Sequence, residues 1–221
     1  PTVVRFCRAL GYDGFQAFRL QLARYLGSSG IYSQFSVSDT DSMTDVSRKV
    51  FDSTIGSLLS VREELDIGAL ESAIAALADA ERVEFYGFGA SGSVAIDAQH
   101  KFFRFNIPVT SYDDALMQRM VAAGAQGGDV IVMISYTGRT KESVDIARVA
   151  RENGATVIGI TNPESPLAEF CTVVVGVTTP EDTEVYMPMS SRIIHLTVID
   201  ILATGVTLKR GSDFLGHLKK I

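Results

Sequence analysis

The α/β fold predicted for this chain rests on residues 129–140, Asp-Val-Ile-Val-Met-Ile-Ser-Tyr-Thr-Gly-Arg-Thr. Its apolar run, which ends at Ile134, is typical of a strand that is buried on both faces of a parallel sheet. Residues 141–152 follow with apolar side chains at helical spacing. The stretch therefore predicts a strand, a loop and a helix, and the loop carries three aliphatic hydroxyls and a glycine.

A loop that joins the carboxyl end of a strand to the amino end of a helix is suited to bind an anion. Free backbone N–H groups and the helix dipole favour a phosphate there, and the hydroxyls of Ser135, Thr137 and Thr140 add neutral donors. The loop has no Gly-Lys-Ser/Thr sequence, which argues against a nucleoside triphosphate with Mg²⁺. We expect a small phosphorylated metabolite, and ordinary helix capping by Ser and Thr is the alternative.

Strand and helix patterns alternate along the rest of the chain. Predicted strands lie at 82–86, 109–111, 129–134, 156–160 and 173–177, and predicted helices at 91–105, 115–123, 141–152, near Leu167 and at 189–208. This alternation predicts an α/β fold, a three-layer αβα sandwich with a mostly parallel sheet. Ligands of such sheets bind at the carboxyl ends of the strands, near a switch in strand order.

Two domains joined by a linker are expected. Residues 1–26 read as two short helices broken by a turn at Gly11, and residues 27–42 are rich in Ser, Gly and Asp, as linkers are. Residues 43–221 begin with two amphipathic helices, predicted at 43–65 and 66–80, and continue into the α/β sandwich. The chain opens at what resembles the first turn of a helix, so a further piece is expected upstream.

Charge is distributed unevenly. Four arginines and one aspartate give residues 1–26 a charge of +3, which leaves −9 for the rest of a chain whose total is −6. This asymmetry predicts a small basic module attached to an acidic metabolite-binding body. The overall negative charge does not exclude DNA, because phosphate contacts depend on the local charge.

The cysteines and the apolar runs indicate the compartment. Cys7 and Cys171 lie far apart without metal-type spacing, so we expect free buried thiols in a reducing cytoplasm and no metal site. No continuous apolar run reaches the roughly 18 residues of a membrane span, and the start lacks a signal-peptide pattern. We therefore expect a cytoplasmic protein with no membrane partner.

A second glycine loop follows the first predicted strand. Residues 87–92, Gly-Phe-Gly-Ala-Ser-Gly, match the dinucleotide-binding pattern G-x-G-x-x-G, and Asp113 lies where a ribose-binding acid is found. A dinucleotide-dependent enzyme is therefore an alternative. The hydroxyls of Ser91 and Ser93, and the second hydroxyl loop one βαβ unit later, argue against it, and we expect no cofactor.

Together, the loops at 87–91 and 135–140 resemble the sugar isomerase (SIS) domain over residues 65–210. The second loop matches the family pattern Ser-x-Ser/Thr-Gly-x-Thr. The resemblance implies that its aliphatic hydroxyls and N–H groups hold a phosphate, and that Ser91 and Tyr136 face the sugar, although Tyr136 occupies a position often filled by a smaller polar residue. The ligand residues assigned in this way are Ser91, Ser135, Tyr136, Thr137, Gly138 and Thr140.

Residues 1–23 are similar to the end of the helix-turn-helix domain of RpiR-type bacterial transcription regulators. The Thr-Val-x-Arg-Phe helix of that family is its recognition helix, so the resemblance implies that Thr2, Arg5 and Arg8 reach DNA. A solvated helix face is the alternative for these arginines. The resemblance also implies a repressor of sugar catabolism that binds a palindrome as a homodimer and senses 2-keto-3-deoxy-6-phosphogluconate.

The amino end of the last predicted helix offers a further anion site. Ser190, Ser191 and Arg192 open that helix, where its dipole favours negative charge. A phosphorylated sugar acid carries a carboxylate besides its phosphate. We therefore expect one of these three residues to contribute to the ligand site.

A sugar-phosphate isomerase of the SIS fold is the remaining alternative. It needs a general base and a ring-opening group, and the candidates are Glu184, His195 and His100. Glu184 lies in an acidic loop that is typical of solvated surface, His195 lies in an apolar helix, and His100 is expected to be half-hidden. No pair of these residues has a spacing that indicates catalysis, so we expect a regulator and not an enzyme.

Overall fold

The computed structural model describes residues 2–19, 37–179 and 189–218. The chain divides into two compact units. The first comprises Pro1–Glu64 and Thr179–Ser190, and the second comprises Leu65–Thr178 and Ser191–Ile221.

In the part of the chain that the structure describes, the second unit contains a five-stranded sheet in the order β2-β1-β3-β4-β5. The strands are β1 (Arg82–Tyr86), β2 (Val109–Tyr112), β3 (Asp129–Ser135), β4 (Thr156–Thr161) and β5 (Val173–Gly176). All neighbouring strands pair in parallel, which confirms the predicted α/β fold. The central strand β3 is buried along its whole length, as its apolar run predicted.

The strand order reverses between β1 and β3. From β1 the chain crosses to β2 on one side, and it then returns past β1 to form β3 on the other side. In open parallel sheets, ligands bind at the carboxyl ends of the strands where two such crossovers diverge. The two loops that the sequence singles out follow these two strands.

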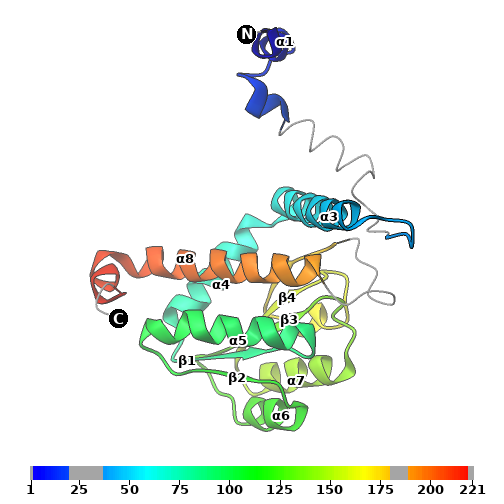
Figure 1. Ribbon diagram of the computed structural model, residues 1–221. Helices are drawn as coiled ribbons and strands as arrows, with labels where there is room; N and C mark the ends of the chain where they lie inside the picture. The colour runs from blue at the N-terminus through cyan, green and yellow to red at the C-terminus, as the bar shows by residue number, and fades with distance from the viewer. Residues whose placement is uncertain (1, 20–36, 180–188, 219–221) are drawn as a thin grey trace. The chain divides into compact units, whose positions relative to one another are not determined.

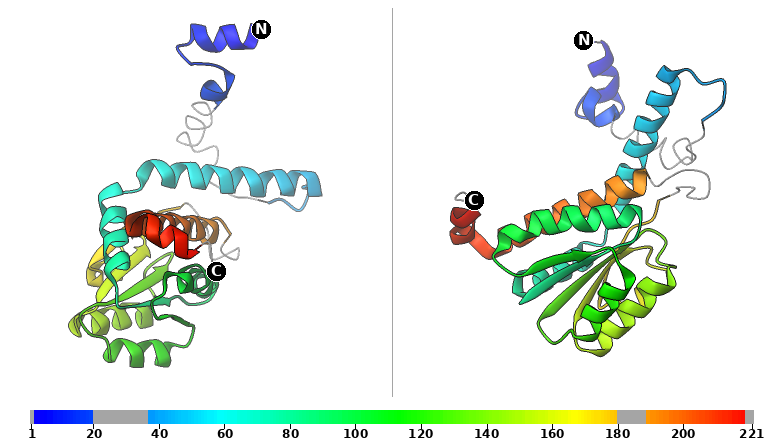
Figure 2. Two further views of the ribbon diagram at one scale, coloured as in Figure 1. Left: turned by 90° about the vertical axis from the view of Figure 1, so that its left-hand side faces the viewer. Right: turned by 60° about the horizontal axis from the view of Figure 1, so that its bottom comes forward.

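Helices cover both faces of the sheet (Figure 1). Figures 1 and 2 show α5 and α8 on one side of the sheet and α6 and α7 on the other. The helices of this unit are α4 (Ile67–Asp79), α5 (Ala90–Phe102), α6 (Ala115–Ala123), α7 (Lys141–Glu152) and α8 (Ser190–Leu218), with short 3₁₀ turns η1 (Phe103–Phe105) and η2 (Ala168–Phe170). The predicted sandwich and its helices are thus confirmed, with ends that shift by a few residues.

Side chains that alternate along each strand build a core on both faces of the sheet. On the side of α6 and α7, Tyr86, Ile131 and Met133 pack with Ile146 of α7. On the other side, the Phe85 ring lies 5.0 Å from the ring of Phe102 in α5. Burial of each such side chain stabilises the fold by roughly 1.5–3 kcal/mol. Packing against helices on both faces therefore stabilises the sheet.

Helix α8 is the longest helix and breaks at Gly211, whose φ is 81°. By length and composition alone, residues 190–211 meet the requirements of a membrane span, with a mean hydropathy of 1.4 over an 18-residue window. The continuous apolar run considered above misses this helix because polar residues interrupt it. Its buried side chains include Val198, Leu202 and Val206, so one face of α8 is part of the core of the second unit.

The first unit contains α1 (Thr2–Ala9), a turn at Gly11, residues 15–19 in helical conformation, and α3 (Met43–Glu64). Gly11 has a φ of 86°, and the Phe18 ring lies 5.5 Å from the Tyr12 ring. The predicted first helix and its Gly11 turn are confirmed, whereas the predicted second helix beyond residue 19 and most of the linker lie outside the described residues. Helix α3 belongs to this unit, while the domain limits at residues 26 and 42 stay predictions.

Candidate functional site

The β3–α7 loop turns back on itself through its own hydroxyls. The amide of Gly138 donates to the Ser135 hydroxyl oxygen at 3.2 Å, and the amide of Arg139 donates to the Thr137 hydroxyl at 3.4 Å. Gly138 has a φ of 60°, a left-handed conformation that favours glycine. The sequence motif therefore specifies a tight turn whose backbone is drawn toward the hydroxyls at its ends.

The amino end of α7 completes this turn. Thr140 is the N-cap residue, and among the described residues its side chain makes no capping hydrogen bond. The first helical bond runs from the Val144 amide to the Thr140 carbonyl, so the amides of residues 141–143 have no acceptor within the helix. Exposed Arg139 and Lys141 add positive charge beside them, a contribution that the sequence reasoning missed. Unpaired helix amides beside positive charge are the kind of donors that favour an anion, and binding of one at this loop stays a prediction.

The β1–α5 loop is shaped by backbone contacts within itself. A Cβ on Gly87 would lie 2.5 Å from the Ser91 carbonyl oxygen, and one on Gly92 would lie 3.2 Å from the Gly87 carbonyl oxygen. Gly89 has a φ of 55°. Glycines at 87 and 92 are therefore needed for the loop to close on the first turn of α5, where Ser91 is half-buried. This local packing explains the G-x-G-x-x-G pattern without a dinucleotide.

The sheet brings the two loops to one edge. Tyr86 at the end of β1 pairs with Met133 of β3, and Ser135 at the end of β3 pairs with Thr161 of β4. The loops that carry Ser91 and Ser135 therefore leave the same edge of the sheet, at neighbouring strands. Within the second loop Tyr136 is half-buried and Thr137 is exposed, and their roles toward a ligand stay predictions.

The amino end of α8 lies at the same edge of the sheet. Lys101 Nζ lies 2.8 Å from the Asp200 carboxylate, and Arg210 donates to the Phe105 carbonyl at 2.5 Å, so α5 and α8 run in the same direction. Ser191 and Arg192 consequently lie at the end where α5 begins. Ser190 and Ser191 are buried and Arg192 is exposed. A contribution of these three residues to the ligand site stays a prediction.

The residues considered for isomerase chemistry differ in their exposure. His195 is 1% exposed, as expected of a core histidine. His100 is exposed on α5, so the expectation that it is half-hidden is wrong, because α5 presents that side to solvent. Glu184 lies outside the described residues. Asp113, the candidate ribose-binding acid, is exposed just beyond β2.

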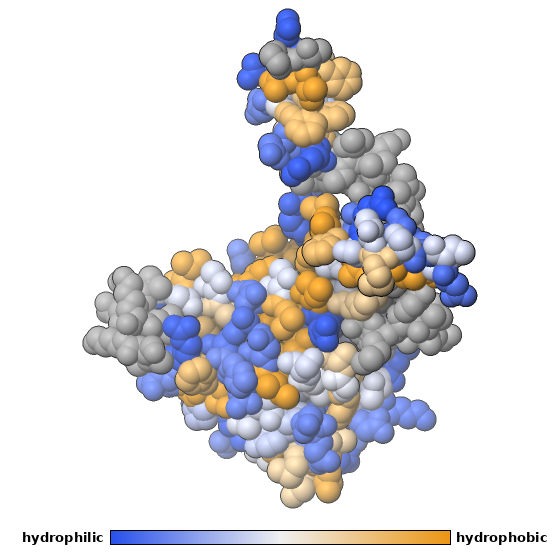
Figure 3. Space-filling model, viewed as in Figure 1, coloured by the Kyte–Doolittle hydropathy of each residue, from blue (hydrophilic) through white to orange (hydrophobic). Residues whose placement is uncertain are grey.

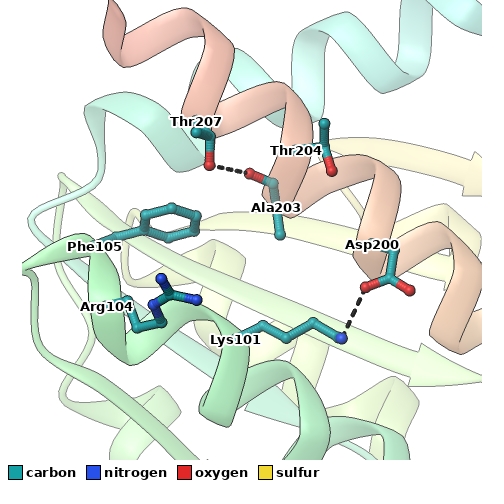
Figure 4. A pocket seen from close by; sticks show the side chains of 7 residues that line it. All are labelled: Lys101, Arg104, Phe105, Asp200, Ala203, Thr204 and Thr207. Carbon is teal, nitrogen blue, oxygen red and sulfur yellow. Dashed lines mark hydrogen bonds and ion pairs between the residues drawn. The ribbon is translucent and has the colours of Figure 1, made fainter. Parts of the chain in front are cut away.

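A hollow of about 210 Å³ lies between α5 and α8 (Figure 4). Lys101 and Arg104 line it together with Asp200, and Lys101 is paired with Asp200 at 2.8 Å and lies 3.6 Å from Asp97. The lining therefore carries two positive charges and one negative charge, and Lys101 is already engaged by carboxylates. Figure 3 shows hydrophobic and hydrophilic side chains interspersed over this face.

Arg5 and Arg8, the arginines assigned to DNA contacts, are exposed on α1, whereas Cys7 is fully buried. Among the apolar residues at helical spacing in this segment, Cys7 alone is buried, whereas Val3, Phe6 and Leu10 are each more than half exposed. The side chain of Thr2, the third residue assigned to DNA, lies outside the described part of the structure. The contacts of all three residues with DNA stay predictions.

Comparison with known proteins finds a family match in each of the two units. A model of the SIS domain matches residues 76–205, and a model of the helix-turn-helix domain of the rpiR family matches residues 1–29. The chain is 51% identical to the HTH-type transcriptional regulator HexR of Pseudomonas aeruginosa, over all of this chain and 78% of that protein. It is 46% identical to HexR of Escherichia coli, over all of this chain and 76% of that protein.

A solved structure extends the match to three dimensions. The Vibrio vulnificus NanR protein, complexed with ManNAc-6P, has a TM-score of 0.73 and 25% sequence identity, over 99% of this chain and 78% of that one. These matches agree with the structure in two respects. The second unit has hydroxyl-bearing loops at the switch in strand order, and the first unit has an exposed basic helix, α1. This chain therefore belongs to the RpiR family of transcriptional regulators, as a HexR-like member with a SIS domain behind its helix-turn-helix segment.

Proposed function

We propose that the SIS domain binds a phosphorylated sugar acid, 2-keto-3-deoxy-6-phosphogluconate, and thereby controls a cytoplasmic repressor of sugar catabolism. The observation that carries this proposal is the β3–α7 loop, which combines unused helix amides with the hydroxyls of Ser135, Thr137 and Thr140 at the strand-order switch. A phosphate dianion matches these donors in charge and number.

The rest of the ligand extends along the crevice. The sugar-acid chain passes between Ser91 and Tyr136, and its carboxylate is held at the amino end of α8 by Ser190, Ser191 or Arg192. The same-direction packing of α5 and α8 supports this arrangement, because it sets a second helix amino terminus beside the first loop. A dianion at one end and a carboxylate at the other distinguish a sugar acid phosphate from a neutral sugar phosphate.

Regulation requires that the effector bind two states of the protein with different affinity. In this proposal the helix-turn-helix segments of a homodimer bind a palindromic operator through Thr2, Arg5 and Arg8. The effector binds more tightly to the state of the protein that has the lower affinity for DNA. The complex of NanR with ManNAc-6P supports a sugar phosphate as the ligand class.

A panel of phosphorylated sugars and sugar acids, screened by thermal unfolding, tests the proposal. We expect 2-keto-3-deoxy-6-phosphogluconate to raise the melting temperature, because a ligand of the folded state stabilises it by mass action. Ser135→Ala and Thr137→Ala should reduce the shift and leave DNA affinity nearly unchanged. Ser72→Ala, an exposed hydroxyl on α4, is the control and should behave as wild type. Equal losses of effector and DNA binding in the loop variants contradict the proposal.

The protein is proposed to be a sensor without catalytic activity. A coupled assay with pentose and hexose phosphates checks this, and we expect no turnover at effector concentrations that saturate the thermal shift. Turnover that Glu184→Gln abolishes would establish the isomerase alternative.

A further inference from the structure

The β3–α7 loop contacts the end of β4 and the turn that follows it, residues 161–167. The Leu167 amide donates to the Gly138 carbonyl at 3.1 Å. Because Ser135 and Thr161 are paired in the sheet, the loop and the turn leave the sheet side by side. Their contact therefore controls where the anion-binding amides point.

Gly138 is the point of closest approach. A Cβ built on it would lie 2.1 Å from the Ser165 hydroxyl oxygen, 2.5 Å from Ser165 Cβ and 2.6 Å from the Thr161 hydroxyl oxygen. The glycine backbone therefore rests directly on two hydroxyl side chains of the turn. These contacts and the left-handed φ of 60° confine the loop to one path.

The two hydroxyl residues are themselves held in place. Thr161 is fully buried and Ser165 is 5% exposed, and their hydroxyl oxygens lie 3.4 Å apart. The Ser165 amide donates to the Asn162 carbonyl at 3.1 Å, and the Val177 amide donates to the Thr161 carbonyl at 2.9 Å. Their burial keeps them from the solvent-facing side of the loop, so they act through Gly138.

We propose that Thr161 and Ser165 are positioning residues of the anion site: they support Gly138 so that the loop amides and the Ser135 and Thr140 hydroxyls converge on one phosphate. This inference rests on the proposed binding of a phosphate by the β3–α7 loop. Hydrogen bonds weaken steeply as their angle and distance depart from the optimum, so a small displacement of Gly138 lowers affinity without unfolding the sheet.

Thr161→Val and Ser165→Ala remove one hydroxyl each and nearly keep the side-chain volume. Calorimetric titration with 2-keto-3-deoxy-6-phosphogluconate, and with inorganic phosphate as a smaller probe, measures the effect. We expect each variant to lose about tenfold in affinity for both probes, comparable to the loss of one charge-assisted hydrogen bond. Thr161→Ser, which restores the hydroxyl, should recover wild-type affinity, a rescue that a purely structural role would not produce.

The glycine supplies a second, independent test. Gly138→Ala should weaken binding by about a hundredfold, because its methyl group would overlap the Ser165 side chain. The double variant Gly138→Ala with Ser165→Gly removes the two nearest atoms and should regain at least about tenfold, a coupling that independent sites lack.

Gly154→Ala is the matched control. Gly154 has a φ of +94° at the amino end of β4, and the atom nearest to its Cβ would be 3.5 Å away. This substitution strains the backbone in the same way, far from the loop, so thermal stability should fall while affinity stays at the wild-type value.

Two sets of results separate the inference from the function on which it rests. A wild-type chain that binds neither probe overturns both. Wild-type binding that Ser135→Ala abolishes, with full affinity retained in Thr161→Val and Ser165→Ala, overturns the positioning role alone. A loss in Gly154→Ala as large as that in Gly138→Ala has the same consequence.

Discussion

Glu84 is a carboxyl group inside the sheet, 2% exposed, in the middle of β1. Neighbouring Arg82 directs its guanidinium at Asp129, with bonds of 3.2 Å and 2.5 Å, and lies 3.8 Å from Glu84. Among the described residues, Glu84 Oε2 has no hydrogen-bond partner. Burial raises the pKa of Glu84 to about 7, against the attraction of Arg82 and with the repulsion of Asp129.

This raised pKa predicts the direction of the pH dependence of stability. The folded state holds the Glu84 proton up to about pH 7, whereas the unfolded chain releases it near 4.5, so stability from this group falls as the pH rises between these values. The free energy of unfolding of the wild type should fall by up to about 3 kcal/mol through this group. In Glu84→Gln that part of the pH-dependent fall should be absent. Urea unfolding of both proteins at pH 5 and pH 8 measures it, with exposed Glu71→Gln as the control. A wild-type profile that Glu84→Gln leaves unchanged contradicts the prediction.

Among the helices, α8 is joined to η1 and α4 through the side chain of Arg210. Arg210 donates to the Phe105 carbonyl of η1 at 2.5 Å and to the Ala78 carbonyl of α4 at 3.0 Å. Its guanidinium lies 5.3 Å from the ring centre of Phe214. Arg210 therefore joins three elements just before α8 breaks at Gly211.

Removing the charge of Arg210 should weaken the attachment of the carboxyl-terminal part of α8 to η1 and α4. We expect Arg210→Met, which keeps the apolar stem, to lower the free energy of unfolding by about 2 kcal/mol through the loss of two charge-assisted bonds. Lys209→Met, at an exposed neighbour, is the control and should change stability little. Urea unfolding provides the measurement. Effector affinity should stay constant, because Arg210 lies at the opposite end of α8 from Ser191, and a parallel loss of affinity would refute this view of α8.

In the molecule as a whole, the loops proposed to bind the effector belong to the second unit and the basic helix α1 to the first. A substitution confined to one unit should therefore affect only one of the two proposed binding functions. Allosteric coupling requires two distinct sites, and in our proposal the two units supply them.

Arg5→Ala and Arg8→Ala test that separation. Each should weaken binding to the duplex that the protein selects from a random-sequence pool. If the contact is to phosphate, the slope of log affinity against log salt should fall by about 1. Fluorescence anisotropy over a range of salt concentrations measures the slope, and Arg62→Ala, an exposed residue of α3, is the control. Unchanged slopes and affinities in both variants would remove these arginines from the DNA interface.

Much of the fold was predictable because its signals are local. The apolar run of β3, the glycines of the β1–α5 loop and the hydroxyls after Ile134 each specify their own segment. The limits of these predictions are also local. His100 was misjudged, since helical spacing does not tell which side of α5 faces solvent, and the support of Gly138 by Thr161 and Ser165 was missed because it joins segments that follow different strands.

Periodicity and turn chemistry in the linear chain establish the strands, the helices and the three hydroxyls of the β3–α7 loop, because these depend on neighbours a few residues apart. Strand order, the meeting of the β1–α5 and β3–α7 loops at one edge, the burial of Glu84 and the contact beneath Gly138 follow from packing between residues far apart in the chain. The free energy of burying a side chain depends on all the elements around it, so these features exist only once the sheet and its covering helices have assembled.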